Sequence, residues 1–411
     1  MTNTFRKIGI IREGKLPADR RVPLTPAQCR EMSIRFPQVD IAVQRSAVRA
    51  FTDAEYEAEG VRLTDDLNDR DLIIGVKEVP VEMLIPGKSY LFFSHTIKQQ
   101  AHNRKLMRAV IEKGITLIDH EMLTDQHGDR VLAFGYWAGV VGAYNAFRAW
   151  QLAHGGPPLK PAHACHDLEE LEGHLRSFPL PKDLRIVMTG GGRVGKGAMG
   201  VLERAGVARV KPQEFLQQGF TKPVYTVLGT ADLYEREDGQ AFDKAAFHTD
   251  PSGHRASFLS YARRAQMYLA CHFWDPRGPK ILSSQDLRDP ALRLRVVADI
   301  SCDVGGPIDS TLRATSIEEP FFGYDPRTAA EAAPGSEGTI TVMAVDNLPC
   351  ELPRDASEAF GLDLIERVMP SLIGQDDPAM IDRATIVDHG RLCDHYAYLA
   401  EYAGLQGSSI A

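Results

Sequence analysis

The stretch "DLRIVMTGGGRVGKGAMGVLERAG", residues 183–206, decides the fold class of this chain. An apolar run that is typical of a strand leads into a glycine-rich turn, and a helix-like segment follows. Glycines at the first, third and sixth positions of the turn permit a tight bend, close approach of the backbone to a pyrophosphate, and close packing of helix on strand. The phosphates would lie at the N-terminus of the helix. The stretch predicts a dinucleotide site formed by Gly190, Gly192, Arg193, Val194 and Gly195.

The residues about 20 positions beyond the glycine turn bear on the choice of nucleotide. An acidic residue is usual there, at the end of the next strand, where it binds the ribose of NAD and repels a 2′-phosphate. The segment "GVARVKPQEF", residues 206–215, instead offers Arg209 and Lys211, with Glu214 slightly late. The cofactor is therefore predicted to be NAD(H) or NADP(H), with Lys211 as a contact and a lean toward NADP(H).

Apolar runs alternate with helix-like segments along the rest of the chain. In the first half we predict strands at "RKIGIIRE" (6–13), "VDIAVQ" (39–44), "DLIIGVKE" (71–78), "SYLFFSH" (89–95) and "ITLID" (115–119). One helix should begin at Pro26, with Thr25 as its N-cap, and a buried helix should cover residues 136–154. Uniformly apolar strands in alternation with helices indicate parallel sheets covered on both faces. The predicted fold class is α/β, with two Rossmann-like, doubly wound parallel-sheet domains.

Composition excludes several classes of function. The chain has 411 residues, 44% hydrophobic and 25% charged, with a net charge of −8, which gives no reason to expect nucleic acid or an anionic membrane as partner. The longest apolar stretch, residues 132–147, is too short to cross a bilayer, and the N-terminus has no apolar signal segment. The six cysteines are scattered, and the histidines of residues 163–174 are loosely spaced, so no metal is expected. We expect a cytoplasmic protein.

Charged side chains follow three of the predicted strands. Arg12 to Lys15 follow the first, Lys77 and Glu78 end another, and His95 with Lys98 end a third. The carboxyl ends of parallel strands meet at one edge of a sheet, where ligands bind. Such a rim could hold carboxylates and place two titratable groups over a reacting centre, with Lys15 and Lys98 as substrate-binding or pKa-tuning residues.

Several stretches together resemble one known family. In the first half these are "GIIREGKLPADRRVPLTP" (9–26), "IIGVKEVP" (73–80), "FFSHTIK" (92–98) and "GDRVLAFGYWAGVVGAYNA" (128–146). They are similar to the N-terminal fold of alanine dehydrogenases and transhydrogenases. Together with "VVADISCDVGGPIDSTLRATSIEEPFFGYDP" (296–326) and "MAVDNLPCELPRDASEAFG" (343–361), they more narrowly resemble lysine-forming saccharopine dehydrogenases and the lysine–ketoglutarate reductase half of bifunctional lysine-degrading enzymes.

The resemblance implies an architecture and a reaction. Two domains would surround a central cleft: residues 1–150 as a substrate domain, completed by C-terminal helices in 350–411, and residues 151–349 as the dinucleotide-binding domain. The implied reaction interconverts saccharopine, NAD(P)⁺ and water with lysine, 2-oxoglutarate and NAD(P)H. The implied partners are these small molecules, and the chain would be a monomer or a homo-oligomer.

The resemblance also implies residue roles. Lys77 matches the lysine proposed as base for the secondary amine, and His95 matches the histidine proposed as acid–base for water addition and carbinolamine breakdown. Further implied contacts or pKa-tuning groups are Arg21, Glu78, Glu121 and Arg130 toward the substrate, with Asp299 and Asp346 toward the cofactor. The chemistry asks for the same residue types. The amine must lose its proton before hydride leaves, which a desolvated lysine can accept, and imine hydrolysis needs a group that both takes and gives a proton, as histidine does.

Two other functions stay open on the sequence alone. An alanine dehydrogenase-like or other opine-type amino acid dehydrogenase would also use an arginine, a lysine and a histidine, and only substrate size would separate it. A non-catalytic NAD(P)-sensing protein is a different class, against which intact Lys77 and His95 argue.

Overall fold

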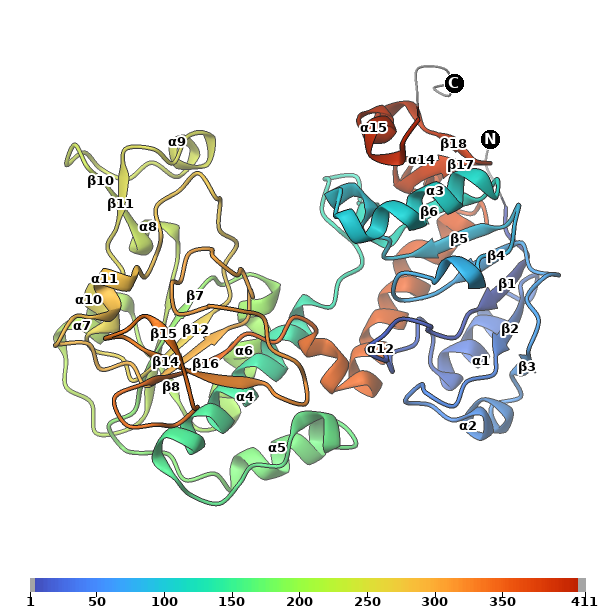
Figure 1. Ribbon diagram of the computed structural model, residues 1–411. Helices are drawn as coiled ribbons and strands as arrows, with labels where there is room; N and C mark the ends of the chain where they lie inside the picture. Colours follow the sequence, from blue (N-terminus) through green and yellow to red (C-terminus); the bar gives the residue numbers. More distant parts are fainter. Residues whose placement is uncertain (1–3, 406–411) are drawn as a thin grey trace. The chain divides into compact units, whose positions relative to one another are not determined.

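The computed structural model describes residues 4–405 and separates them into two compact units (Figure 1). Residues up to Ala133 and from Pro353 onward form the first unit, and Phe134–Leu352 forms the second. Residues 134–150, which the sequence placed with the substrate domain, therefore lie in the second unit, as do 350–352. The reason is that the long helix α4 (Gly135–His154) packs along the second sheet.

The first unit is built on an eight-stranded sheet. From edge to edge its strands are β18 (Arg391–Leu392), β17 (Thr385–Asp388), β6 (Thr116–Asp119), β5 (Ser89–Phe92), β4 (Leu72–Ile74), β1 (Lys7–Ile10), β2 (Asp40–Gln44) and β3 (Arg62–Thr64). The strands from β6 to β3 are parallel, in the usual doubly wound order, which reverses direction between β1 and β4. The five strands predicted in this half are confirmed.

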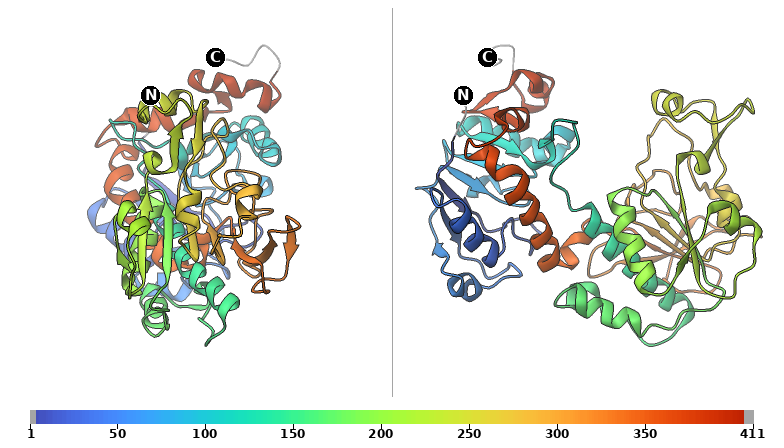
Figure 2. Two further views of the ribbon diagram at one scale, coloured as in Figure 1. Left: turned by 90° about the vertical axis from the view of Figure 1, so that its left-hand side faces the viewer. Right: turned by 180° about the vertical axis from the view of Figure 1, so that it is seen from behind.

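Helices cover both faces of this sheet and can be followed from three directions in Figures 1 and 2. They are α1 (Pro26–Arg35), α2 (Asp53–Ala58), α3 (Arg104–Glu112), α12 (Pro353–Asp363), α13 (Met369–Leu372), α14 (Pro378–Ala384) and α15 (Ala400–Ala403). The predicted start of α1 is confirmed, because the Thr25 side chain accepts a hydrogen bond from the Gln28 amide and Pro26 is the first helical residue.

The C-terminal segment is not only helical, so that prediction was incomplete. β17 and β18 form an antiparallel hairpin, and β17 extends the first sheet by pairing with β6. The two-residue turn between them, His389–Gly390, has positive φ angles of 45° and 78°. Such turns are usually signalled by Asn-Gly or Asp-Gly, and histidine in the first position concealed this one.

The second unit contains another eight-stranded sheet. From edge to edge its strands are β15 (Ala330–Ala332), β14 (Phe321–Asp325), β16 (Ile340–Met343), β13 (Val296–Asp299), β12 (Met267–Ala270), β7 (Arg185–Thr189), β9 (Val224–Leu228) and β8 (Ala208–Arg209). β14 and β15 are antiparallel, so both sheets are mixed rather than wholly parallel. The strand beside β7 is β9, not β8, so the second and third strands of the usual order are exchanged.

The remaining elements of the second unit surround this sheet. They are α5 (Leu168–Arg176), α6 (Arg193–Arg204), α7 (Pro212–Gln217), α8 (Thr230–Leu233), α9 (Lys244–Thr249), α10 (Leu259–Ala262), α11 (Ser284–Leu287) and the hairpin of β10 (Tyr234–Arg236) and β11 (His254–Ala256). Within residues 4–405, no helix has the length and apolar character that a membrane crossing requires.

Helices α4 and α6 meet backbone to backbone. A Cβ atom added at Gly139 of α4 would lie 1.8 Å from the Val194 carbonyl oxygen, and one added at Gly197 of α6 would lie 2.0 Å from the Tyr136 carbonyl oxygen. No side chain fits in either place. Since α6 begins within the glycine-rich turn, this contact also fixes the position of the turn.

Replacing Gly139 by alanine should therefore lower the free energy of unfolding of the second unit by about 1–3 kcal/mol, the usual cost of overpacking. The matched control is Gly173→Ala in α5, where an added Cβ meets only an arginine side chain at 3.9 Å. Removing that helical glycine should instead raise stability by roughly 0.5–1 kcal/mol. All three tryptophans, Trp137, Trp150 and Trp274, lie in the second unit, so urea unfolding followed by tryptophan fluorescence measures both variants. Equal effects of the two substitutions would contradict this account of the packing.

Candidate active site

The predicted rim of charged residues exists in the first unit. β1, β4, β5 and β6 are consecutive parallel neighbours, so their carboxyl ends lie along one edge of the sheet. His95 follows β5 in a left-handed conformation, with φ of 53°, and is the N-cap residue of the short helix η2 (Thr96–Lys98). A non-glycine residue in this conformation costs of order 1–3 kcal/mol, and such residues concentrate at functional sites.

Glu78 joins two of the predicted residues. Its Oε1 lies 2.6 Å from Nδ1 of His95, and its Oε2 accepts a hydrogen bond of 2.9 Å from Nζ of Lys15. Burial opposes ionisation of Glu78, but the hydrogen bond with His95, the positive charge that this ring carries when it is protonated, and the hydrogen bond with Lys15 outweigh burial and hold the pKa of this carboxyl well below its usual range. Glu78 is therefore an anion, and Nδ1 of His95 donates to it.

This hydrogen bond sets the tautomer of His95. With Nδ1 carrying a proton, the neutral ring has its lone pair on Nε2, which is the acceptor. Nε2 has no hydrogen-bond partner within residues 4–405. The ring also stacks on Phe93, with centroids 6.2 Å apart and an angle of 16° between the planes. His95 is thus held on two sides, and one nitrogen is left to take a proton.

Lys77 lies beside Glu78 at the end of β4 and is only partly exposed. Burial, with the positive charges of Arg21 and Lys15, lowers the pKa of its ammonium to about 8. Its amine is therefore available as a base close to neutral pH, which a solvated lysine is not. Lys15, Lys77, Glu78 and His95 form one electrostatically linked group, which we call the Lys77 cluster.

Glu13 lies beneath this cluster, and sequence reasoning missed it as a site residue. Its two carboxyl oxygens accept hydrogen bonds from the backbone amides of Val76, at 2.6 Å, and Lys77, at 2.9 Å. Burial, and then the neighbouring charge of Asp19, raise the pKa of Glu13 to about 8. The only signal in the sequence was a glutamate after the first strand. Glu13 fixes the backbone that carries Lys77.

Arg21, which the resemblance implied as a substrate contact, lies in a buried ion pair. Its side chain is only 1% exposed, and its Nε and Nη2 donate to the two carboxylate oxygens of Asp19, at 3.0 and 2.5 Å. Burial raises the pKa of Asp19, but the paired guanidinium more than offsets this and leaves it far below the usual range. Arg20, by contrast, is exposed. A role of Arg21 in holding substrate stays a prediction, since what the structure displays is a buried ion pair behind Lys77.

Glu121, Lys98 and Arg130 form an adjacent ion-pair group. Glu121 Oε1 lies 2.5 Å from Nη2 of Arg130 and 3.3 Å from Nζ of Lys98. Against the effect of burial, these two cations lower the pKa of Glu121. Asp119 at the end of β6 accepts hydrogen bonds from the backbone amides of Ser94 and Glu121, and so ties this group to the end of β5. Of the two carboxylates implied to tune the site, Glu78 pairs with His95 and Glu121 pairs with Lys98 and Arg130.

The second unit holds an open pocket of about 880 Å³ around the glycine-rich turn. Gly190, Gly192, Arg193 and Val194 line it, as predicted, together with residues that follow β9, β12 and β13. Gly190 has a φ of 86°, and a Cβ at Gly195 would lie 2.1 Å from the Gly190 carbonyl oxygen, whereas a Cβ at Gly192 would meet nothing within 4 Å. The turn is therefore closed toward the protein and open toward the pocket, as pyrophosphate binding requires. These residues fit a dinucleotide.

Four residues predicted to contact the cofactor do not line this pocket: Gly195, which closes the turn against Gly190, and Asp299, Asp346 and Lys211. Asp299 is fully buried, and its oxygens accept hydrogen bonds from Ser301, Cys302 and Thr311. Asp346 lies beyond β16, and Lys211 follows β8 at the edge of the sheet. Asp299 organises the loop after β13. Contacts from Asp346 and Lys211 stay predictions.

Sequence reasoning also missed residues that do line the pocket. His272 follows β12, and its Nδ1 lies 2.6 Å from the Thr189 hydroxyl. Burial lowers the pKa of His272 to about 4, so the ring is neutral, and its buried Nε2 has no partner within residues 4–405. The segment "CHFW" directly after an apolar strand was the available signal. His272 has one polar atom ready for a ligand group.

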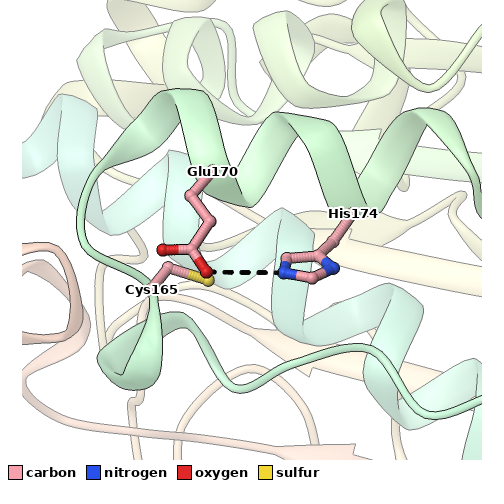
Figure 3. A group of neighbouring side chains, drawn as sticks. All are labelled: Cys165, Glu170 and His174. Carbon is pink, nitrogen blue, oxygen red and sulfur yellow. Dashed lines mark ion pairs between the residues drawn. The ribbon is translucent and has the colours of Figure 1, made fainter.

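A third cluster, in the second unit, combines Cys165, Glu170 and His174 (Figure 3). One donor atom from each lies within 4.8 Å of the others. Glu170 already bonds the Lys160 ammonium and the His166 amide, and His174 Nε2 is 3.7 Å from its carboxylate. Burial raises the pKa of the Cys165 thiol to about 11. Because Lys160 already supplies a positive charge to Glu170, we interpret the cluster as structural: it holds the start of α5 against the chain that precedes it.

Comparisons with known proteins find relatives that align with most of this chain. Residues 9–141 match the family "Alanine dehydrogenase/PNT, N-terminal domain". The chain is 33% identical to an alpha-aminoadipic semialdehyde synthase of Arabidopsis thaliana, over 95% of this chain and 41% of that protein. It is 31% identical to a fungal protein, the saccharopine dehydrogenase (NAD(+), L-lysine-forming) of Emericella nidulans, over 88% of this chain and 90% of that relative.

The chain belongs to the family of L-lysine-forming saccharopine dehydrogenases. The family resemblance predicted from the sequence is thereby confirmed. Among its other relatives, the chain spans less than half the length of the semialdehyde synthases, 41% of the Arabidopsis protein and 46% of that of Rattus norvegicus. A solved L-alanine dehydrogenase structure has a TM-score of 0.64 at 17% identity and covers 96% of this chain and 98% of its own, so the fold of this saccharopine dehydrogenase family member is that of alanine dehydrogenase.

The buried pair behind Lys77 yields a stability prediction. Asp19→Ala should lower the free energy of unfolding by about 3–5 kcal/mol, because Arg21 would stay buried without its partner. Because the pKa of Asp19 is lowered in the folded state, this stabilisation is complete above the usual pKa of a carboxyl group and is lost progressively as the pH falls from there through the lowered value. Urea unfolding followed by circular dichroism measures the change. The control Arg20→Ala should alter stability by no more than about 0.5 kcal/mol. The double variant Asp19→Leu, Arg21→Met should recover most of the loss; no recovery would contradict the ion-pair explanation.

Proposed function

We propose that this chain is an NAD(P)-dependent oxidoreductase that interconverts saccharopine and water with lysine and 2-oxoglutarate. The observation that carries the proposal is the Lys77 cluster, in which a lysine of lowered pKa and a histidine held by a carboxylate lie at neighbouring strand ends. The names of the relatives support the same reaction. The nicotinamide, when bound along the glycine-rich turn, supplies the acceptor or donor of the hydride.

Lys77 acts first in the direction of amine oxidation. Its unprotonated amine takes the proton from the secondary amine of the substrate, so that the nitrogen lone pair can assist the departure of hydride from the neighbouring carbon. Burial keeps the fraction of unprotonated Lys77 high enough near neutral pH. Glu13 holds the Lys77 backbone and so positions the amine.

His95 acts on the water that hydrolyses the carbon–nitrogen double bond. Nε2 takes a proton from water as it adds, while Nδ1 keeps its hydrogen bond to Glu78, which stabilises the imidazolium that forms. The same proton is then given to the departing amine. Lys15 shares Glu78 with His95 and limits the basicity of that carboxylate.

Substrate carboxylates have a candidate partner other than Arg21. Arg12 is exposed at the end of β1, in a pocket of about 680 Å³ that Arg45 and Arg49 also line. Arg45 and Arg49 pair with Asp53, whereas the Arg12 side chain has no ion pair within residues 4–405. Arg12 can therefore accept a carboxylate without losing an existing partner.

Turnover of defined substrate pairs tests the proposal. Purified protein should oxidise NADPH or NADH in the presence of lysine and 2-oxoglutarate, and should reduce the oxidised cofactor with saccharopine. Preference for ammonia with pyruvate would instead support an alanine dehydrogenase-like enzyme. Binding of the reduced cofactor without turnover of any amine and oxo acid would support a nucleotide-sensing protein.

The roles of the two central side chains predict a kinetic defect. Lys77→Met and His95→Gln should each lower kcat by a factor on the order of 10²–10⁴, the usual contribution of a general acid–base group. The matched controls are Lys105→Met and His102→Gln, two exposed positions on the same unit outside the cluster, which should keep kcat. Wild-type turnover in either cluster variant would show that the proton is carried by another group.

The pH dependence of kcat/KM distinguishes Lys77 from Glu13 as the titrating group. Amine oxidation needs Lys77 unprotonated, so kcat/KM should rise with pH up to the pKa of about 8 and level off above it. The pKa of Glu13 is raised to about 8 as well, so its carboxyl group also titrates in this range. The rise of kcat/KM with pH should persist in Glu13→Gln and should be absent from the residual activity of Lys77→Met. If the rise were instead absent from Glu13→Gln and present in Lys77→Met, the titrating group would be Glu13.

A further inference from the structure

Because β8 and β9 are exchanged in the sheet, the residue that contacts the adenosine ribose is expected after β9 and not after β8. In the usual arrangement, the strand beside the first one ends in the residue that contacts the ribose of the adenosine. Here that strand is β9, and the amide of Gly190 donates a hydrogen bond of 3.0 Å to the carbonyl of its last residue, Leu228. Gly229 and Thr230, which follow β9, line the pocket, whereas Lys211, which follows β8, does not.

An inserted segment brings basic side chains to this side of the pocket. Between β9 and β12 the chain forms the hairpin β10–β11 and the helix α9, which lie together in Figure 1. Phe247 fixes α9, because its ring stacks on Tyr234 at 4.6 Å and meets His254 edge-on at 5.0 Å. Lys244 and His248 flank Phe247, are one helical turn apart, and both line the pocket.

The charged residues that line the pocket come from several elements, and Arg193 lies at the start of α6. The acidic residues that line it, Asp275 and Asp303, follow β12 and β13. The side of β9 and α9 has Lys244 and His248 and no lining carboxylate. The acids nearest to these two residues in the sequence, Asp243 and Asp250, accept hydrogen bonds from the amides of Ala246 and Ser252, and Asp232 accepts one from the amide of Gly229. Lys244 is exposed and has no ion pair within the described residues.

We propose that Lys244 and His248 bind the 2′-phosphate of NADP(H), so that this chain favours NADP(H) over NAD(H). The inference rests on the proposed function, because it assumes that the pocket around the glycine-rich turn holds a nicotinamide dinucleotide. A phosphate monoester is attracted by an ammonium and an imidazole ring, and the Thr230 hydroxyl can donate a further hydrogen bond. The selectivity then comes from the insertion and not from the residue at the end of β8.

Direct binding tests the inference without any turnover. Calorimetric titration of the full chain with NADPH, NADH and 2′,5′-ADP should give tighter binding of NADPH than of NADH. Lys244→Ala should weaken NADPH and 2′,5′-ADP by about tenfold or more, the loss expected for one charge-assisted contact, and the charge reversal Lys244→Glu should weaken them further. His248→Ala should weaken the same two ligands, so that the ratio of the NADPH and NADH dissociation constants moves toward one.

Lys211→Ala is the comparison variant, because it removes a lysine of the same charge from the end of β8. A loss of NADPH affinity in Lys211→Ala and not in Lys244→Ala would overturn the inference, as would equal weakening of NADPH and NADH by Lys244→Ala. Tighter binding of NADH by the unaltered protein would overturn it as well. Failure of the proposed function looks different: NADPH would bind with the expected dependence on Lys244, yet lysine with 2-oxoglutarate would not oxidise it.

Discussion

The carboxylate of Glu78 is the anion on which the site in the first unit depends. It lies between Nδ1 of His95 and the ammonium of Lys15, and it belongs to the strand end that also carries Lys77. The hydrogen bond fixes the imidazole tautomer, while burial and then the charges of Arg21 and Lys15 lower the pKa of Lys77. These contacts form only if β4 and β5 are adjacent and parallel, so the chemistry of the site depends on the topology of the sheet.

The sequence could predict the features that follow from local pattern. Apolar runs located the strands of the first sheet, Thr25 and Pro26 located the start of a helix, and charged residues after three runs located the rim. Features that depend on distant pairing were not predictable. Nothing in the two residues of β8 shows that β9 will take the place beside β7, and the partner of Arg21 became evident only from its burial against Asp19.

The two sheets show which parts of the dinucleotide-binding motif can be located from the sequence and which cannot. Gly190 to Gly195 have the expected geometry because their spacing is enforced within a single turn. The acidic or basic residue expected about 20 positions later depends on which strand neighbours the first, and a local motif does not determine that. In the first sheet the usual order holds, whereas in the second the exchange places Lys211 at an edge and leaves α9 to face the pocket.

The hairpin of β17 and β18 has a consequence for synthesis of the chain. β17 covers the edge of β6, yet the ribosome makes it only after the whole second unit has been translated. Until then, β6 has unpaired backbone groups along one side, and the apolar residues of β6 and α3 that later contact β17 and α15 are exposed. Such an open edge can pair with other nascent chains. The second unit is continuous in sequence and has no such delay, so the first unit is where a chaperone would have most to protect.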